Sequence, residues 1–439
     1  MIRFIHAADI HLDSPMRGID SALAGIDSKI YRSSTRLALI NLINFANKEK
    51  VDFVTLGGDN YDGDWDSFQT GLFFLEQMSG LGTIPVVSIT GNHDAANKMT
   101  LNLKFPRNFK QLDVDSPEVY EVIDGVRVIG QGFKNQKEDR NLVKEYPQLD
   151  GRGIKIGLLH TSLDGKEGHG CYAPCTIDDL RSRHYHFWGL GHIHKHSWEL
   201  PPGDLPILFP GNIQGRHIRE TGPKGAWLIT MDDHGNMVES HFEPLDVTRW
   251  ELATIDISPM ERLEELWNQC GIELTRLRNL AGERTLATRF EIQGFSDLHY
   301  DLHEIKSKKY DEDGIQAQIQ SEANTVAQKK IWVEKVKLST GPPVNEEMNV
   351  PAMAYLHEFI NEKANSDEWI QKFMASDEIT KLKQQVDIFP AHEAAEMAAL
   401  FDAEFIRGLM HEVPSTLKTH LNSNSLVKDE ILKVEDSLS

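Results

Sequence analysis

Acidic, imidazole and amide side chains gather in five short segments of this 439-residue chain. Such groups together suit borderline divalent ions such as Mn²⁺, Fe²⁺ or Zn²⁺ better than Ca²⁺ or bare Mg²⁺, which prefer mainly oxygen ligands. Two ions roughly 3.5 to 4 Å apart can clamp a phosphodiester, and Asp59 is the natural carboxylate to bridge them. The segments are Asp9-Ile10-His11, Gly57-Gly58-Asp59-Asn60-Tyr61-Asp62, Gly91-Asn92-His93-Asp94, His160 and Gly191-His192-Ile193-His194. They predict a two-metal site for phosphoester hydrolysis.

Each of these segments follows a short apolar run that predicts a β-strand. In open α/β sheets, ligands collect at the carboxyl ends of strands. Alternate residues of an extended segment project the same way, so Asp9 with His11, and His192 with His194, can each converge on one site. The predicted strands cover residues 2–7, 51–56, 85–90, 154–159 and 187–190.

No single segment identifies a metal site. A lone Asp-x-His or His-x-His arises often by chance, and Gly-Asn-His-Asp is also a good turn sequence. The metal interpretation depends on finding all five segments in this order, each directly after an apolar strand.

The remaining elements predict three domains, over residues 1–245, 246–339 and 346–439. A helix over 32–48 and hairpins over 119–130 and 225–242 complete an α/β domain with mixed sheets. After residue 245, alternating strands at 251–257, 288–293 and 331–338, with helices at 259–276 and 296–308, predict a small α+β domain. A linker over 339–345, containing Gly341-Pro342-Pro343, precedes a helical region without strands.

Composition narrows the class of protein. The chain is 40% hydrophobic and 26% charged, which is typical of a folded globular protein. Its net charge of −21 argues against a protein that coats nucleic acid, although a nuclease needs only a local positive surface. The three cysteines, Cys171, Cys175 and Cys270, form no disulfide framework, and Cys171 with Cys175 lacks the further ligands of a zinc site. The N-terminus resembles neither a signal peptide nor a spanning helix, so the cytoplasm and no membrane contact are expected.

The motifs DIH, GGDNYD, GNHD, LLHT and GHIH resemble the calcineurin-like metallophosphoesterase superfamily over residues 1–245. More narrowly, MIRFIHAADIHLDSPMRG and GNIQGR resemble the YhaO branch of the SbcD nucleases, bacterial relatives of the eukaryotic Mre nuclease. The resemblance implies a sandwich of mixed β-sheets flanked by helices, then a capping domain and a helical C-terminal region. It also implies a DNA exonuclease, with endonuclease activity as an option, that uses two divalent ions. Mn²⁺ is expected first, with Fe, Zn and Mg as alternatives.

Residue roles carried over from the resemblance place Asp9, His11 and His194 on one ion. Asn92, His160 and His192 would bind the other, with Asp59 between them. His93 would protonate the leaving oxygen or stabilise the transition state, unless it only donates a hydrogen bond that orients a ligand. Asp62 and Asp94 would orient the ligands beside them. Tyr61 departs from the phenylalanine that is usual in the family at this place.

DNA and protein partners are expected from the same resemblance. The chain has no Gly-x4-Gly-Lys-Ser/Thr loop, so a separate ATPase with a coiled coil, of the SbcC or YhaN type, would be the motor. A homodimer is also expected, and the C-terminal helices either dock the ATPase or form a self-contained subdomain. In the first domain, the candidates for phosphate contact are Arg216, Arg219 and Lys224, which follow or lie close behind the GNIQG turn. In the second domain, the candidates, which could equally form a solvated face, are Lys306, Lys308, Lys309, Lys329, Lys330, Lys335 and Lys337, with Trp332 as a stacking or packing ring.

Two other functions share these residues. A metallophosphoesterase acting on nucleotides or phosphoproteins would need the same ligands, but no domain for gripping DNA. A scaffold without metals, which only recruits a partner, is disfavoured because no ligand position is lost.

Overall fold

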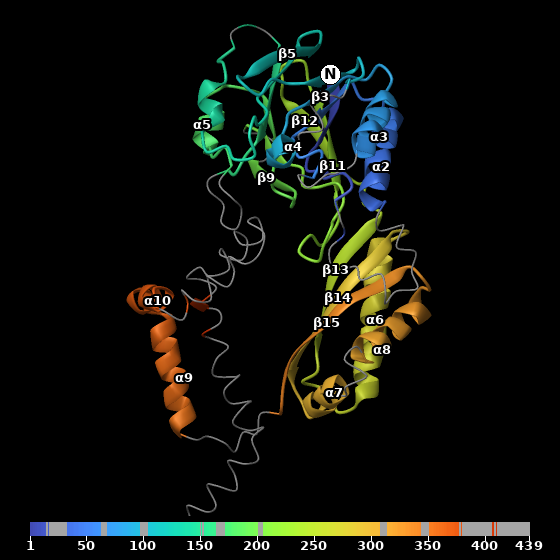
Figure 1. Cartoon of the computed structure of the whole chain (residues 1–439), viewed down its shortest axis with the longest axis vertical. Helices are drawn as coiled ribbons and strands as arrows, with labels where there is room; N and C mark the ends of the chain where they lie inside the picture. Colours follow the sequence, from blue (N-terminus) through green and yellow to red (C-terminus); the bar gives the residue numbers. More distant parts are fainter. Residues whose placement is uncertain are drawn as a thin grey trace, which may run out of the picture.

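The computed structural model describes residues 1–14, 16, 33–62, 68–96, 104–149, 151, 153–163, 172–200, 205–307, 314–343, 351–376, 379, 406–407 and 410. Arg32, Cys171, Lys308 and Lys309 lie outside the described residues. Figure 1 shows a large two-sheet domain joined to a smaller sheet with helices, and a separate pair of C-terminal helices.

The first sheet of the large domain carries the strands that lead to Asp9, Asp59 and Asn92. β1 to β4 are parallel, and β11 and β12 add an antiparallel hairpin, so the sheet is mixed as predicted. Helices α2 (Ser34–Glu49) and α3 (Phe68–Ser79) bury apolar side chains against it. The strand order is β12 (Met237–Pro244), β11 (Gly225–Met231), β1 (Ile2–Ala7), β2 (Phe53–Leu56), β3 (Val86–Ser88) and β4 (Phe109–Gln111).

The second sheet packs face to face on the first and leads to His160 and His192. Phe4 and Phe53 of the first sheet stack at 4.9 Å between ring centroids, and Phe187 of the second meets Phe4 edge-on at 5.4 Å. Short helices α4 (Asn92–Ala96), η2 (Leu142–Glu145) and α5 (Ile177–Arg181) join the strands. The order is β5 (Glu118–Ile123), β6 (Val126–Gly130), β7 (Ile154–His160), β8 (Phe187–Gly191), β10 (Ile207–Phe209) and β9 (Ser197–Leu200).

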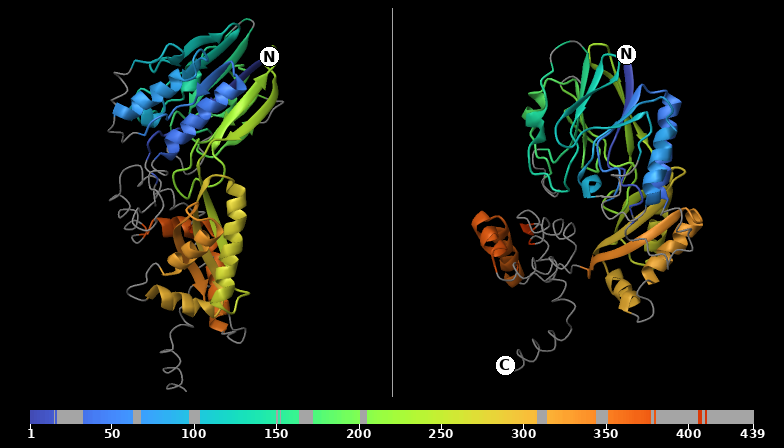
Figure 2. Two further views of the ribbon diagram at one scale, coloured as in Figure 1. Left: turned by 90° about the vertical axis from the view of Figure 1, so that its right-hand side faces the viewer. Right: turned by 45° about the horizontal axis from the view of Figure 1, so that its top comes forward.

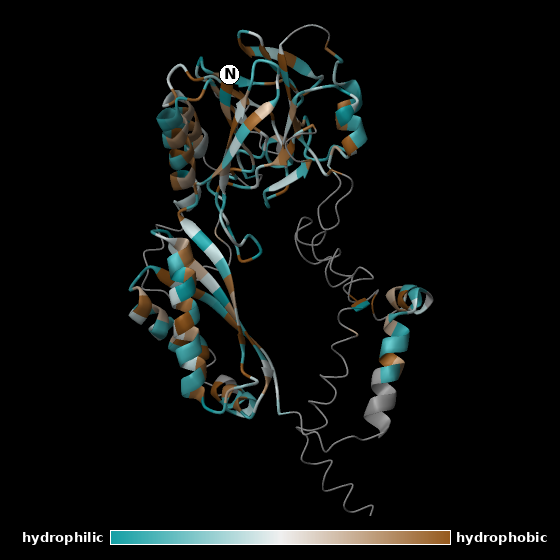
Figure 3. Ribbon diagram, turned by 180° about the vertical axis from the view of Figure 1, so that it is seen from behind, coloured by the Kyte–Doolittle hydropathy of each residue, from teal (hydrophilic) through white to brown (hydrophobic). Residues whose placement is uncertain are grey.

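The smaller domain, here called the cap, has a three-stranded sheet with helices on one face (Figures 1 and 2). Its strands alternate with helices and are all parallel. Apolar residues recur every three or four positions along α6, so that Leu266, Cys270, Leu274 and Leu277 face the sheet; the alternation of hydrophilic and hydrophobic residues is visible in Figure 3. The elements are β13 (Thr248–Asp256), α6 (Leu263–Ala281), β14 (Thr285–Phe295), α7 (Leu298–Ser307), α8 (Gly314–Val326) and β15 (Ile331–Gly341).

The predicted linker over 339–345 is wrong at its start. β15 continues to Gly341 because Ser339 pairs with Gln293 and Gly341 pairs with Phe295. The cross-strand hydrogen bonds of β14 therefore outweigh the Gly-Pro-Pro signal until Pro342, which has no N–H to donate.

The cap joins the large domain through a small apolar cluster. Trp250 and Trp332 meet edge-on at 6.2 Å, and Ile218 of the large domain packs against them. The Trp250 indole N–H donates to Gly215 O at 3.0 Å, and the Gln214 amide donates to Thr248 O at 2.7 Å. Trp332 is 2% exposed, so it is a packing ring, and the stacking alternative for this residue is wrong.

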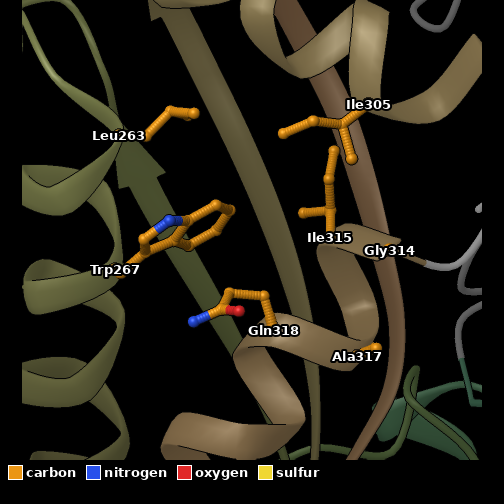
Figure 4. A pocket seen from close by; sticks show the side chains of 7 residues that line it. All are labelled: Leu263, Trp267, Ile305, Gly314, Ile315, Ala317 and Gln318. Carbon is orange, nitrogen blue, oxygen red and sulfur yellow. The ribbon is translucent and has the colours of Figure 1, made fainter.

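An apolar pocket of about 400 Å³ lies between the helices of the cap. Figure 4 shows Leu263 and Trp267 of α6 facing Ile305 of α7 and Ile315 of α8. All of its lining residues belong to the cap, so it is separate from the strand ends where the predicted ligands lie.

The C-terminal region contains α9 (Pro351–Ala364) and α10 (Asp367–Met374), in agreement with its predicted helical character. The Trp369 and Phe373 rings stack at 5.0 Å, and Ile370 packs with Ile379 and Ile406. Among the described residues, no helix has the length and apolar character needed to cross a membrane.

Candidate metal centre

The loops after β1 and β2 run side by side and bring the first ligands together. Asp9 N donates to Gly58 O, and His11 N donates to Asp59 O, both at 3.0 Å. Asp9, His11 and Asp59 have φ values of 51°, 43° and 51°, in a region that such residues rarely adopt. Backbone strain of this kind persists where the surrounding structure enforces it, and it is typical of functional sites.

Two imidazoles donate from Nδ1 to acceptors that orient the rings, and a third, that of His11, has its Nδ1 near a carboxylate without a hydrogen bond. His11 Nδ1 lies 3.5 Å from Asp62 Oδ1, and His160 Nδ1 donates to Gly57 O at 2.9 Å. His194 Nδ1 donates to Glu220 Oε1 at 2.7 Å. In their neutral forms, the His160 and His194 rings therefore direct Nε2, with its lone pair, toward the centre, which is the arrangement of metal-binding histidines.

The Nε2 atoms converge with carboxylate and amide oxygens. His11 Nε2 and His194 Nε2 lie 3.2 Å apart, and Asp9 Oδ1 is 4.0 Å from His194 Nε2. Around His160 Nε2, Asn92 Oδ1 lies at 3.0 Å and Asp59 Oδ2 at 3.4 Å. Three groups have ligand atoms that lie within 4.8 Å of one another: Asp9, His11 and His194; His11, Asp59 and His93; and Asp9, Asp59 and His160. Asp59 Oδ2 lies 3.8 Å from His11 Nε2 and 3.4 Å from His160 Nε2, so Asp59 stands between these two histidines.

His192 completes the predicted set on the side of His160. Its backbone N–H donates to both carboxylate oxygens of Asp9, at 3.0 and 3.1 Å, and its φ is 102°. Its ring lies 5.3 Å from the His160 ring and 5.2 Å from that of Tyr172. All seven predicted ligands are therefore brought to one edge of the sandwich.

Gly91 has no side chain, and this keeps the space beside two of the ligands open. A Cβ on Gly91 would overlap Asp59 Oδ1 and would lie 2.7 Å from His160 Cε1. His11 Nε2 and His194 Nε2 lie 3.2 Å apart, and when both rings carry their protons on Nδ1 one cation can bind both lone pairs. The donor set and this spacing fit two divalent ions.

The electrostatics also favour bound cations. Burial, followed by repulsion from Asp59, raises the pKa of Asp94 to about 7. Burial likewise raises the pKa of Asp9. Burial alone would lower the pKa of His160, but Asp59 outweighs it and raises this pKa to about 9. So many buried carboxylates require positive charge nearby.

His93 and the two flanking carboxylates lie beside the ligands. His93 Nδ1 is 3.0 Å from Asp62 Oδ1, and its ring meets the His11 ring edge-on at 4.8 Å. Although burial opposes it, contact with Asp62 raises the pKa of His93. Asp94 accepts hydrogen bonds from Gly91 N at 3.0 Å and Tyr61 N at 2.9 Å, so it ties two ligand-bearing loops together.

In the segment 211–224, Lys224 and Arg216 are more buried than the predicted phosphate contacts would require, and Glu220 contacts a ligand that the sequence did not connect with it. Lys224 is 6% exposed, and its Nζ donates to His194 O at 3.0 Å, so its ammonium group is buried against the ligand loop. The Arg216 side chain is 12% exposed and donates to Glu220. Sequence reasoning missed Glu220, because nothing in its surroundings links it to a histidine 26 positions earlier. Arg219 is exposed, and its predicted phosphate contact stays a prediction.

The predicted basic residues of the cap differ in whether the structure describes their side chains and in whether they form an ion pair. Lys335 and Lys337 are exposed on β15, and Lys337 pairs with Glu291 at 3.2 Å. Lys329 and Lys330 are also exposed. Lys306 lies on α7, whereas Lys308 and Lys309 are outside the described residues.

Comparison with known proteins places this geometry in a family. Residues 2–196 match the calcineurin-like phosphoesterases, and residues 250–341 match the middle domain of the metallophosphoesterase YhaO. An uncharacterized metallophosphoesterase YhaO from Bacillus subtilis is 32% identical over 299 residues, covering 67% of this chain and 72% of that protein. The SbcD component of the nuclease SbcCD from Staphylococcus epidermidis is 22% identical over 284 residues, covering 58% and 72%.

Among solved structures, a dimetal phosphatase from Danio rerio is 13% identical, with a TM-score of 0.33, and it covers 55% of this chain and 98% of its own. The family assignment depends instead on the two domain matches and on the YhaO relative, which agree with the ligand motifs and with the paired mixed sheets. The chain belongs to the calcineurin-like metallophosphoesterases, with a cap of the YhaO type.

Proposed function

We propose that this metallophosphoesterase is a DNA nuclease that hydrolyses phosphodiester bonds with two Mn²⁺ ions. The observation that carries the proposal is the convergence of imidazole Nε2 atoms on the Asp59 carboxylate at 3.4 to 3.8 Å. DNA as the substrate is supported by the likeness to the SbcD component of the nuclease SbcCD. That name also supports an SbcC-type ATPase as the partner.

The seven ligands divide into two sets around Asp59. Asp9, His11 and His194 would hold one ion. Asn92, His160 and His192 would hold the other. When bound, two divalent ions lower the pKa of water and neutralise the charge that develops on the phosphodiester.

His93 is the proposed proton donor to the leaving oxygen. Its Nδ1 lies 3.0 Å from Asp62 Oδ1, and Nε2 would be the atom that gives a proton to the leaving oxygen. The side chain is 32% exposed, unlike His11 at 1% and His160 at 0%, so a substrate can reach it. A positioned imidazole of this kind contributes roughly 10²- to 10⁴-fold in rate.

Exposed cations on the cap are proposed to bind the DNA backbone beyond the metal centre, along a path here called the DNA route. A β-bulge between Thr288 and Arg289 shifts the register, so that Lys335 pairs with Arg289 and Lys337 with Glu291. These lysines therefore project from the same face of the sheet as Trp332, against which Ile218 packs. Arg219 follows Ile218 directly, so exposed cations continue from the large domain onto β15.

The deciding experiment is a nuclease assay on end-labelled linear DNA and on circular DNA, with Mn²⁺, with Mg²⁺ and without metal. Degradation of linear DNA that depends on Mn²⁺ is expected. Hydrolysis of mononucleotides or phosphoproteins, with no cleavage of either DNA, would contradict the nuclease proposal while leaving the metal centre intact.

The DNA route has its own test. The variant with Lys335→Glu and Lys337→Glu should bind DNA more weakly and show a smaller salt dependence, by about two fewer phosphate contacts. Lys48→Glu is the matched control, because Lys48 is 77% exposed on α2, away from the cap. Equal DNA affinity of the double variant and the control would remove β15 from the route.

Partner docking is proposed for the C-terminal helices α9 and α10, and copies of the chain are proposed to pair. A chain that ends at Pro343 should retain Mn²⁺-dependent hydrolysis but fail to co-purify with an SbcC-type ATPase. Co-purification of the shortened chain at the wild-type level would place the docking site elsewhere.

A further inference from the structure

The segment from Gly211 to Lys224 wraps around His194 and holds its backbone. His194 O accepts hydrogen bonds from Asn212 N at 3.2 Å and from Lys224 Nζ at 3.0 Å. Gly211 has a φ of 75°, and a Cβ there would lie 2.9 Å from His194 O. The backbone of the ligand loop is thus fixed from one side by this segment.

The same segment contacts the ring of His194. Glu220 Oε1 accepts from His194 Nδ1 at 2.7 Å, and Glu220 is only 5% exposed. A buried carboxylate is costly unless donors surround it. Here Arg216 Nη2 donates to Oε1 at 3.1 Å, Arg216 N donates to Oε2 at 2.7 Å, and Asn212 Nδ2 donates to Oε2 at 2.9 Å. Glu220 is therefore held in one position by donors other than His194.

This contact selects one tautomer of His194. A carboxylate only accepts hydrogen bonds, so the proton of the neutral ring must sit on Nδ1. Nε2 then carries the lone pair and faces His11 Nε2 at 3.2 Å. Arg216 Nη2 also lies within hydrogen-bond distance of His194 Nδ1, at 3.2 Å, as well as of Glu220 Oε1. A lone pair on Nδ1 that accepted from Arg216 would face the Glu220 carboxylate at 2.7 Å, and this repulsion keeps the proton on Nδ1.

We propose that Glu220, held by Arg216 and Asn212, is a positioning residue that keeps His194 in the tautomer and orientation needed to bind one of the two metal ions. The inference rests on the metal centre of the proposed function, but it does not depend on DNA as the substrate. Partners of this kind change metal affinity by roughly 10- to 100-fold when removed.

The test measures Mn²⁺ bound per chain after equilibrium dialysis, by elemental analysis, together with Mn²⁺ titration calorimetry. Wild-type protein should bind about two ions. Glu220→Ala should keep one ion and bind the second roughly 10- to 100-fold more weakly. Glu220→Gln keeps an oxygen that can accept from Nδ1, so it should recover part of the lost affinity.

The matched control is Glu243→Ala. Glu243 also accepts from a histidine, His241 Nε2 at 3.1 Å, but the side chains of His241 and Glu243 are 56% and 35% exposed, and neither residue belongs to the ligand groups found in the described part of the chain or forms a hydrogen bond with His194. The control should bind both ions as the wild type does. Thermal unfolding of each metal-free variant separates the positioning role from a folding defect.

Three outcomes are informative. Wild-type affinity for both ions in Glu220→Ala would overturn the inference alone. A fall in both affinities that Glu220→Gln does not rescue, together with a lower melting temperature, would make Glu220 a structural residue and also overturn it. A wild-type chain that binds no Mn²⁺ would instead refute the metal centre of the proposed function.

Discussion

His11 Nε2 and His194 Nε2 face each other at 3.2 Å although 183 positions separate the two residues. Glu220 Oε1 accepts from His194 Nδ1 at 2.7 Å, whereas Asp62 Oδ1 lies 3.5 Å from His11 Nδ1 without a hydrogen bond. A divalent ion that binds both Nε2 atoms would link the loop after β1 to the loop after β8.

Mn²⁺ should stabilise the fold through this centre. An ion present at 100 times its dissociation constant should raise the free energy of unfolding by about 2.7 kcal/mol per site, measured by urea denaturation. Asp59→Asn should abolish most of this gain, because Asp59 lies between both ligand groups. Asp178→Asn, at a side chain that is 92% exposed, is the control and should keep the gain. A full gain in Asp59→Asn would exclude Asp59 as the bridge.

Gly91→Ala should remove Mn²⁺ binding without removing any ligand. The added Cβ would overlap the Asp59 carboxylate and press on His160, so both ligands must move. Gly271→Ala is a suitable control, because no atom lies within 4 Å of its added Cβ in helix α6. The control should gain roughly 0.5 to 1 kcal/mol of stability. Normal Mn²⁺ binding by Gly91→Ala would show that the site is wider than the structure indicates.

His93→Ala should separate hydrolysis from metal binding. Mn²⁺ content should stay at the wild-type level, and the rate of phosphodiester cleavage should fall by about 10²- to 10⁴-fold. His241→Ala, whose side chain is 56% exposed on β12, should cleave at the wild-type rate. An active His93→Ala would leave His93 with no role in proton transfer, and loss of metal would make it a ligand.

Stability should decrease in acid because of His6, which lies in the sandwich core outside the metal centre. Its ring bonds to Leu190 O and to the Thr55 hydroxyl, both at 3.0 Å, and burial lowers its pKa from 6.5 to about 4. Above pH 6.5 the ring is neutral in both folded and unfolded chains, and its full stabilising contribution is present. As the pH falls from 6.5 toward 4, His6 becomes protonated in the unfolded chain but stays neutral in the folded chain. Stability is therefore lost in that interval, by up to about 3 kcal/mol.

Urea denaturation between these pH values measures the effect. His6→Gln, which has no proton to bind, should be less stable near neutral pH but should lose less stability toward pH 4. Parallel pH profiles for the two proteins would show that His6 stays neutral for another reason, or that other groups dominate.

The ligand set could be predicted from sequence because its determinants are local. Each ligand is the last residue of an apolar strand or lies within four residues after it, and the ends of parallel strands meet at one edge of a sheet. The helix over 32–48 is predictable for a similar reason, since its apolar stripe is continuous, and it appears as Ser34–Glu49.

Elements with weak local signals could not be predicted in this way. In α8, the buried positions are Ile315, Ile319 and Ala323, and the many polar residues between them make the apolar periodicity too weak to recognise from the sequence. The extension of β15 to Gly341 depends on pairing with β14, which no local signal records.

The seven candidate ligands, then, follow from the sequence alone. Which partners the surrounding basic and acidic residues contact was decided only by the tertiary structure. Lys224 turns inward to His194 O, and Glu220 holds His194 Nδ1, because a buried charge settles where its partners are, however far away along the chain. Sequence spacing reports which groups share a strand end, whereas desolvation and the need for hydrogen-bond partners select the contacts between segments.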